Sequence, residues 1–206
     1  MKLMWFHLMP YTELPDDFKE KHPSVWVDIH SSLFDPKRAH LMYNDFMDEL
    51  EYAADLGYDG VMLMAKRPHL SVLDFGAKDR AQLRKRIEKR KLRDLCIAGY
   101  NNFTGDLEHG EVPHREIQIH YITELARRAE ALGAGVVRIF TAYEHPALGP
   151  EGLAQMVAET IRECARRAAD CGVVIGVQNH HDIAAGYESL ADLIETVGEP
   201  NCRACF

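Results

Sequence analysis

The sequence predicts a parallel α/β fold of the (β/α) barrel type, and three observations carry this prediction. Short apolar runs alternate with longer amphipathic segments at a repeat of roughly 35 residues, which is typical of strand–helix units in barrels or doubly wound sheets. The clearest run, Val173–Val177, is almost continuously apolar, as expected for a parallel strand covered on both faces. No run is followed by the GxGxxG motif of a dinucleotide-binding sheet, so the doubly wound alternative loses support.

Each apolar run and amphipathic segment can be assigned to an element. The predicted strands are Lys2–Met9, Asp59–Met64, Leu95–Tyr100, Val136–Phe140, Val173–Val177 and the start of a sixth at Cys202–Phe206. The predicted helices are Asp35–Leu56, Lys78–Arg90, Arg115–Leu132, Pro150–Cys171 and Tyr187–Val197. Tyr11–Phe34 is predicted as a long loop, which in a compact domain usually covers or contributes to a site. Because an eight-unit barrel typically needs about 250 residues, we expect about six of the eight β/α units in a truncated domain.

Composition favours one cytoplasmic domain spanning residues 1–206. The 47% hydrophobic content can form a substantial core. The net charge of −8, with acids and bases mixed, indicates no basic surface of the kind that binds nucleic acid. No apolar run approaches the roughly 20 residues of a membrane span, and Met1–Met9 is too short for a signal peptide. The five cysteines form no disulfide framework; Cys202 and Cys205 have CxxC spacing but no second pair, so packing in the core is the preferred interpretation.

Polar side chains gather directly after the predicted strands, at the edge where parallel α/β proteins bind their ligands. The richest group follows the fifth strand and comprises Gln178, Asn179, His180, His181 and Asp182. Because adjacent side chains of an extended segment point to opposite sides, only one of the two histidines is expected to face the barrel mouth. That histidine faces substrate or metal, or it forms hydrogen bonds within a polar loop. Asp182 is expected to orient an imidazole or to cap the next helix.

Earlier strand ends supply further candidates. His69 is a candidate ligand or proton-transfer group, with fixing of its own loop as the alternative. Glu144 is a candidate general base, since isomerisation of a hydroxy-ketone moves protons to and from carbon, although acids at strand ends also cap helices. Lys66 and Arg67 are candidates for attracting an anionic sugar, or they form an exposed charged pair. Arg138 lies in a strand that should be buried, so its charge must be paired; we expect it to orient a carboxylate in preference to contacting a substrate phosphate.

From about residue 46 to residue 206 the sequence resembles the sugar phosphate isomerase/epimerase group of xylose-isomerase-like TIM barrels. The resemblance is carried, in order, by Leu56–Val61, Met64–Ser71, Cys96–Tyr100, Val137–Thr141 and Val177–Asp182. It implies isomerisation or epimerisation of a sugar or sugar acid by proton transfer, assisted by a divalent metal (Mn, Mg or Zn) that carboxylates and a histidine hold at the barrel mouth. The family's glutamate at the fifth strand end corresponds to Gln178, a poorer ligand because it brings no charge, and the next carboxylate would follow Phe206.

This resemblance sorts the candidates into three roles. The catalytic candidates are Glu144, His69 and His181. The substrate-binding candidates are Asn179, Lys66, Arg67 and Arg138, and the remaining metal ligands are Gln178 and His180.

Residues 1 to about 60 resemble a different family, the N-terminus of a bacterial-luciferase-like flavin monooxygenase. This second resemblance is carried by Phe6–Tyr11, Leu14–Phe18, Ser24–Asp28 and Leu50–Ala53. It implies FMN as an alternative cofactor, with His7 and Trp26 retained, although Met64–Arg67 replaces that family's Asn-Glu-His-His strand end. We interpret the chain as a hybrid joined between Asn44 and Val61. A third hypothesis is a catalytically inactive fragment that forms homo-oligomers through open barrel edges.

Overall fold

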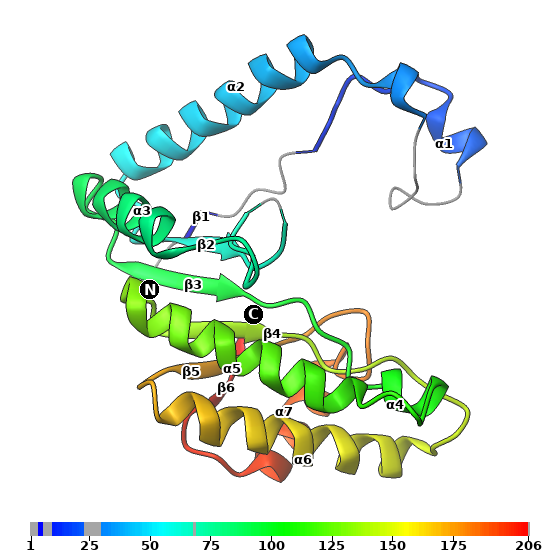
Figure 1. Ribbon diagram of the computed structural model, residues 1–206. Helices are drawn as coiled ribbons and strands as arrows, with labels where there is room; N and C mark the ends of the chain where they lie inside the picture. The colour runs from blue at the N-terminus through cyan, green and yellow to red at the C-terminus, as the bar shows by residue number, and fades with distance from the viewer. Residues whose placement is uncertain (1–3, 6–9, 23–29, 68, 206) are drawn as a thin grey trace.

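The computed structural model describes residues 4–5, 10–22, 30–67 and 69–205. Its strands form one parallel sheet in which each strand pairs with the next along the chain (Figure 1). The strands are β1 (Met4–Trp5), β2 (Gly60–Met64), β3 (Asp94–Ala98), β4 (Val136–Ile139), β5 (Val174–Gln178) and β6 (Cys202–Cys205). Because this order never reverses, the sheet lacks the switch point of a doubly wound fold. The predicted barrel-type fold class is therefore confirmed.

Helices connect the strands, and the five long ones begin and end within a few residues of their predicted bounds. The helices are α1 (Phe18–Lys21), α2 (Pro36–Asp55), α3 (Ala77–Lys89), α4 (Gly105–Glu108), α5 (His114–Leu132), α6 (Pro150–Ala169) and α7 (Tyr187–Val197), with a 3-10 turn η1 (Ser31–Leu33). The short elements α1 and η1 lie in the segment predicted as loop, and α4 was not predicted. The predicted strand Lys2–Met9 is a strand at Met4–Trp5, and its other residues lie outside the described ranges. None of the described helices combines the length and apolarity needed to cross a membrane.

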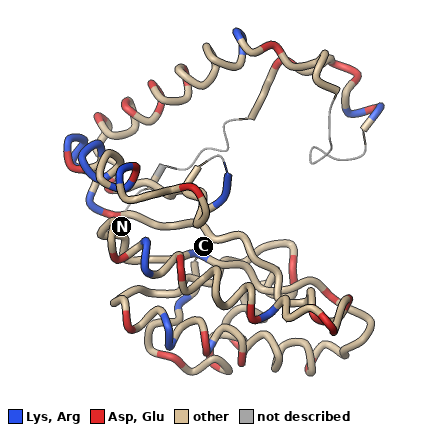
Figure 2. The backbone as a smooth tube through the Cα atoms, viewed as in Figure 1, with Lys and Arg blue, Asp and Glu red and all other residues tan. Residues whose placement is uncertain are grey.

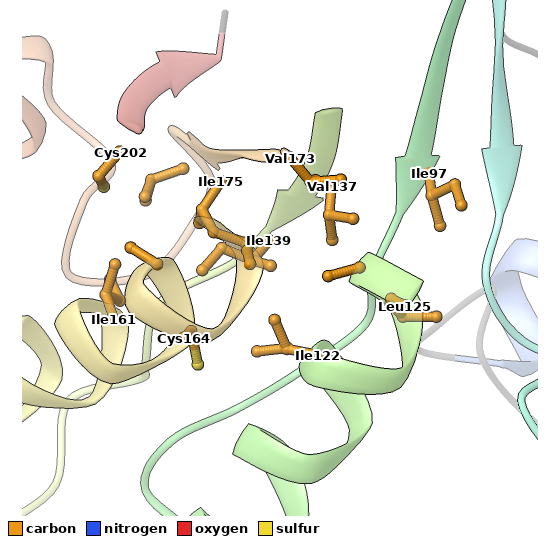
Figure 3. Close-up of a cluster of buried hydrophobic side chains, with 14 of the residues drawn as sticks. Ile97, Ile122, Leu125, Val137, Ile139, Ile161, Cys164, Val173, Ile175 and Cys202 are labelled. Carbon is orange, nitrogen blue, oxygen red and sulfur yellow. The ribbon is translucent and has the colours of Figure 1, made fainter. Parts of the chain in front are cut away.

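The core lies between the sheet and the layer formed by α5, α6 and α7. Helix α5 contacts β3 and β4, α6 contacts β5, and α7 contacts β6 (Figure 1). Figure 3 shows side chains of α5 and α6 meeting those of the central strands; fully buried members are Ile122, Leu125, Val137, Ile139, Ile161 and Ile175. Burying each such side chain contributes about 1.5–3 kcal/mol, so this layer fixes β3–β6 firmly.

Gly133 ends α5, and its position explains why the sequence requires glycine there. Its φ of 77° lies in the left-handed region, where a side chain is strained, and its amide donates to the carbonyls of Ala129 and Glu130. The chain can therefore turn directly into β4.

Helix α2 is well capped but weakly packed. The Asp35 carboxylate accepts hydrogen bonds from the amides of Lys37 (2.8 Å) and Arg38 (3.3 Å), and Pro36 occupies the first turn. Figure 1 shows α2 rising away from the sheet. Basic residues cluster on α3, whereas most charged positions along α2 are acidic (Figure 2), and an ion pair between Arg90 and Glu51 joins the end of α3 to α2. Local signals thus form this helix. Its tertiary contacts include those with the segment before it, through the ion pair of Arg38 with Glu13 and the hydrogen bond from Thr12 to Met42, and those with the end of α3.

Candidate functional site

The carboxyl ends of β2 and β3 are joined by a phenol from α5. The Tyr121 hydroxyl donates to the Ala65 carbonyl (2.6 Å) and accepts from the Tyr100 amide (3.3 Å). Burial raises the pKa of Tyr121, so the hydroxyl is protonated at neutral pH and can act as that donor. Sequence patterns gave no sign of this residue, because Tyr121 lies on a helix remote in sequence from both strand ends.

Side-chain groups also extend the sheet beyond the ends of β3, β4 and β5. The Asn101 amide donates to the Phe140 carbonyl (2.8 Å), and its oxygen accepts from the Phe140 amide (3.0 Å). The Asp182 carboxylate accepts from the amides of Thr141 and Ala184, each at 3.0 Å. The predicted role of Asp182 is therefore wrong. Its oxygens accept from main-chain amides that follow β4 and β5, and from no imidazole among the described residues. The N-cap of α7 is Gly186, so Asp182 does not cap that helix either.

Aromatic side chains form a continuous series across these strand ends, which we call the aromatic row. Its members are Tyr100, Phe140, His180, His181 and Tyr143. The ring centroids of Tyr100 and Phe140 lie 5.9 Å apart, those of Phe140 and His180 4.2 Å, and those of the two histidines 3.9 Å. The His181 and Tyr143 rings follow at 5.8 Å, with 3.5 Å between His181 Nε2 and the Tyr143 hydroxyl. Both histidines thus belong to one surface, although the alternation argument predicted that they diverge.

Two cations contact the Tyr100 end of the aromatic row. Lys66 Nζ lies 4.2 Å from the Tyr100 ring centroid. The Arg138 guanidinium carbon lies 4.2 Å from the centroid of Phe140 and 5.2 Å from that of Tyr100, and Nη1 donates to the Gly99 carbonyl at 3.0 Å. Arg138 is buried, as predicted, but no carboxylate in the described part of the chain forms an ion pair with it. The expected orientation of a neighbouring carboxylate is therefore wrong.

The imidazole of His180 is biased toward its neutral form. Burial lowers the pKa of His180, the neighbouring His181 and Arg138 lower it further, and Asp182 partly opposes them. Although His69 is exposed, desolvation by nearby chain atoms lowers its pKa and the charge of Lys66 adds to this effect. Both rings therefore have a nitrogen free of a proton at neutral pH.

The remaining predicted residues are spread along the same edge. Arg67 forms two hydrogen bonds with the exposed Asp74 carboxylate, the contact through Nη2 measuring 3.0 Å, which matches the charged-pair alternative. Glu144 is exposed after β4, while Gln178 and Asn179 are half-buried at the end of β5. The roles of these residues stay predictions from the sequence.

His69 opens onto a different part of the surface from His181. A cavity of about 800 Å³ lies between α2, α3 and β2, with His69 at its border. Its apolar lining includes Leu50, Val61, Leu63, Phe75 and Ile87. No other predicted site residue is among the described residues that line this cavity. The loop after β2 therefore places His69 beside the helices.

The described donors do not fit the divalent metal that the family resemblance implies. Gln178 and His180 supply one amide oxygen and one imidazole, and the Asp182 carboxylate is already engaged with main-chain amides. Within the described ranges, no three histidine, cysteine or acidic side chains converge as a metal site. Because a divalent cation is stabilised by charged oxygen donors or several imidazoles, these residues alone do not form its site.

Fold and site together define a barrel-type α/β protein with a polar and aromatic surface at its strand ends. Residues 50–206 match the family described as xylose isomerase-like TIM barrel, and the chain belongs to this family. A comparison with curated proteins finds no match.

Solved structures show the same fold at low sequence identity. D-psicose 3-epimerase from Clostridium cellulolyticum H10 is 19% identical, with a TM-score of 0.61 over 78% of this chain and 57% of that one. The 3-keto-D-glucoside 4-epimerase YcjR from E. coli is 17% identical, with a TM-score of 0.59 over 77% and 61%. The probable 3-DHS dehydratase AsbF from Bacillus anthracis is 17% identical, with a TM-score of 0.59 over 77% and 56%. The chain thus spans less than two thirds of the length of these proteins.

Proposed function

We propose that the strand-end surface binds a sugar or sugar acid and supports its isomerisation or epimerisation. The observation that carries this proposal is the aromatic row with Lys66 and Arg138 at one end. Aromatic faces pack against the apolar side of a sugar ring, while a few convergent polar groups orient its hydroxyls. Asn179 and Gln178, half-buried beside the row, would supply such groups. Two of the similar structures are epimerases of sugars or sugar derivatives, which supports the same class.

Isomerisation requires a group that removes a proton from the carbon next to a carbonyl and returns it to another position. We assign this role to His181, whose Nε2 lies 3.5 Å from the Tyr143 hydroxyl at the open end of the row. Glu144, which follows Tyr143 on the same loop, is a second proton acceptor, and His69 would act only on a substrate that reaches the end of β2. A divalent metal would polarise the carbonyl in the family reaction. Since the described donors do not fit one, no step is assigned to it.

Solvent exchange tests this proposal directly. The purified chain is incubated with a panel of ketohexoses and hexuronates in deuterated water, and loss of the C–H signal next to the carbonyl is followed by proton NMR. We expect His181→Gln to slow exchange by about 10²–10⁴-fold, the range for a lost acid–base group. His120→Gln, an exposed histidine on α5, is the matched control and should leave the rate unchanged. Exchange at the no-protein rate, or equal losses in both variants, would reject the proposal.

A second candidate is self-association through strand edges. In the described sheet, β1 and β6 each pair with one neighbour only, and unpaired strand edges can pair with another chain. Sedimentation equilibrium over a hundredfold range of concentration would show a mass that rises with concentration. A constant monomer mass would reject this candidate.

The flavin alternative stays a prediction from the N-terminal segment. His7 and Trp26 lie outside the described residues, and the family match begins at residue 50. Titration of FMN with the protein, followed by flavin fluorescence, would support it only if the fluorescence is quenched with saturation.

A further inference from the structure

We propose that Arg138 binds the carboxylate of an acidic sugar, so that the substrate class is a sugar acid. This inference rests on the proposed sugar-binding function and adds a charge requirement to it. It begins from the placement of Arg138 on β4. Val137 and Ile139 belong to the core beneath α5 and α6, so Arg138 projects to the opposite face of the sheet, as does Phe140.

The Arg138 guanidinium is buried without a matching anion. The residue is 3% exposed, Nη1 has the Gly99 carbonyl as its partner, and Nε has no hydrogen-bond partner among the described residues. A buried charge is costly unless it is paired, and contacts with two aromatic rings offset only part of that cost. The arrangement is therefore suited to an anion that arrives with a ligand.

The ionisable neighbours of Arg138 do not supply the missing charge. Burial raises the pKa of Cys96 to about 12 and also raises the pKa values of Cys205 and Tyr121. All three groups are therefore neutral at pH 7. The charge of Arg138 also lowers the pKa of His180, but an imidazole is either neutral or positive and cannot balance a cation. The Asp182 carboxylate keeps its charge, but its two oxygens accept from main-chain amides, and it forms no ion pair with Arg138 among the described residues.

The burial of the group favours a carboxylate over a phosphate. The planar guanidinium presents its donors as a fork that matches the oxygens of either anion, but a flat anion with one charge loses less hydration in a covered site than a tetrahedral phosphate with nearly two. The Arg138 guanidinium carbon contacts the rings of both Tyr100 and Phe140, at 5.2 Å and 4.2 Å from their centroids, and neither ring can accept as a carboxylate does. Because Nε is covered as well as unpaired, a carboxylate reaches it only when the side chains that cover it move. Lys66, above the Tyr100 ring, would add attraction for the same anion.

Binding measurements with matched sugars test this inference. D-glucuronate, its neutral methyl ester, D-glucose and glucose 6-phosphate are titrated against the full chain by calorimetry. We expect glucuronate to bind about 10–100-fold more tightly than the ester or glucose, the effect of one charge-assisted pair, and more tightly than the phosphate. Glucuronate should also change the near-ultraviolet circular dichroism of the tyrosines, because it binds beside the Tyr100 ring. Equal affinities for acid and ester, or tighter binding of the phosphate, would overturn the carboxylate assignment.

Variants separate binding by Arg138 from its structural role. Arg138→Gln should abolish the preference for the acid, and Arg138→Lys, which keeps the charge without the fork, should retain only part of it. Arg128→Gln is the matched control: Arg128 on α5 also donates to a carbonyl, that of Val72, and also has an unpartnered buried Nε, but it lies away from the aromatic row. This control should keep the full preference. An equal loss in the Arg128 and Arg138 variants would overturn the inference, and if Arg138→Gln fails to fold, the lysine variant and the ester comparison decide.

The same titrations distinguish this inference from the proposed function. Equal binding of glucose, ester and glucuronate, together with solvent exchange, would overturn the role of Arg138 and leave the isomerase proposal standing. Arg138-dependent binding of glucuronate without exchange would support the inference and reject the reaction. Absence of binding by every sugar would reject both.

Discussion

Helices α2 and α6 are both 20 residues long and both begin with proline, yet the protein holds them very differently. Nine residues of α6 are buried, on a face that meets α5, α7 and β5, whereas only three residues of α2 are buried. Figure 1 shows α6 lying along the sheet and α2 leaving it. The comparison shows that an amphipathic pattern is enough to form a helix. The helix packs firmly only where another surface of the protein covers its apolar face.

The difference between the two helices divides the candidate site. The ends of β3, β4 and β5 rest on the packed layer and carry the aromatic row. The end of β2 borders the cavity beneath α2, where His69 lies. A rigid layer can hold groups at the separations that proton transfer needs, so the row is the better place for chemistry.

A pair of identical substitutions tests the comparison with the largest expected effect. Leu153 on α6 is 2% exposed and Leu41 on α2 is 53% exposed. We expect Leu153→Ala to lower the free energy of unfolding by about 2–5 kcal/mol, because it removes buried methyl groups and leaves a cavity. Leu41→Ala should change it by less than about 0.5 kcal/mol. Urea unfolding measures both, and similar losses would show that α2 is packed as firmly as α6.

The Asp182 carboxylate provides the next test, since it joins the ends of β4 and β5. Asp182→Ala leaves the Thr141 amide without its partner, which should cost about 1–3 kcal/mol in the free energy of unfolding. Asp45→Ala, an exposed acid on α2, is the matched control and should have little effect. Hydrogen exchange of the Thr141 amide should accelerate only in the Asp182 variant. Unchanged protection of that amide would contradict the assigned hydrogen bond.

Glycines that end helices give a smaller and more local test. Gly57 after α2 and Gly133 after α5 have φ values of 86° and 77°, and a methyl group at either position would meet open space. Alanine should therefore introduce backbone strain alone, about 1 kcal/mol at each position. For Gly133→Ala we expect this loss in global unfolding, because α5 unfolds with the core. For Gly57→Ala we expect faster amide exchange at the end of α2 and a smaller loss in the free energy of global unfolding. A larger global loss for Gly57→Ala than for Gly133→Ala would contradict the comparison of the two helices.

Much of the fold was predictable because local chemistry sets it. Pro36 and Pro150 mark helix starts, Gly133 marks a helix end, and the apolar run at β5 marks a buried strand. The weak packing of α2 was not predictable, since periodicity identifies an apolar face without showing what that face meets.

The site was predictable in outline, because parallel strand ends converge, but not in its contacts. Burial of Arg138 followed from its place in an apolar strand, whereas its partners, two rings and a carbonyl, depend on how neighbouring strands align. The role of Asp182 was mispredicted because its partner amide at Thr141 lies 41 residues away in the sequence. Tyr121 was missed for the same reason: its partners are 21 and 56 residues distant.

The smallest expected effect is a pH dependence of stability at His180, inside the packed half of the site. Burial, assisted by His181 and Arg138, lowers the pKa of this imidazole below its ordinary value of about 6.5. The unfolded chain then binds a proton more readily than the native one, so the contribution of His180 to stability is complete above about pH 6.5 and is lost as the pH falls toward the lowered native pKa. His180→Gln should therefore flatten the decline in the free energy of unfolding between pH 7 and pH 5. A slope that is unchanged or steeper would show that the imidazole is not held neutral against the Phe140 ring, and the aromatic row would then be looser than the layer beneath it.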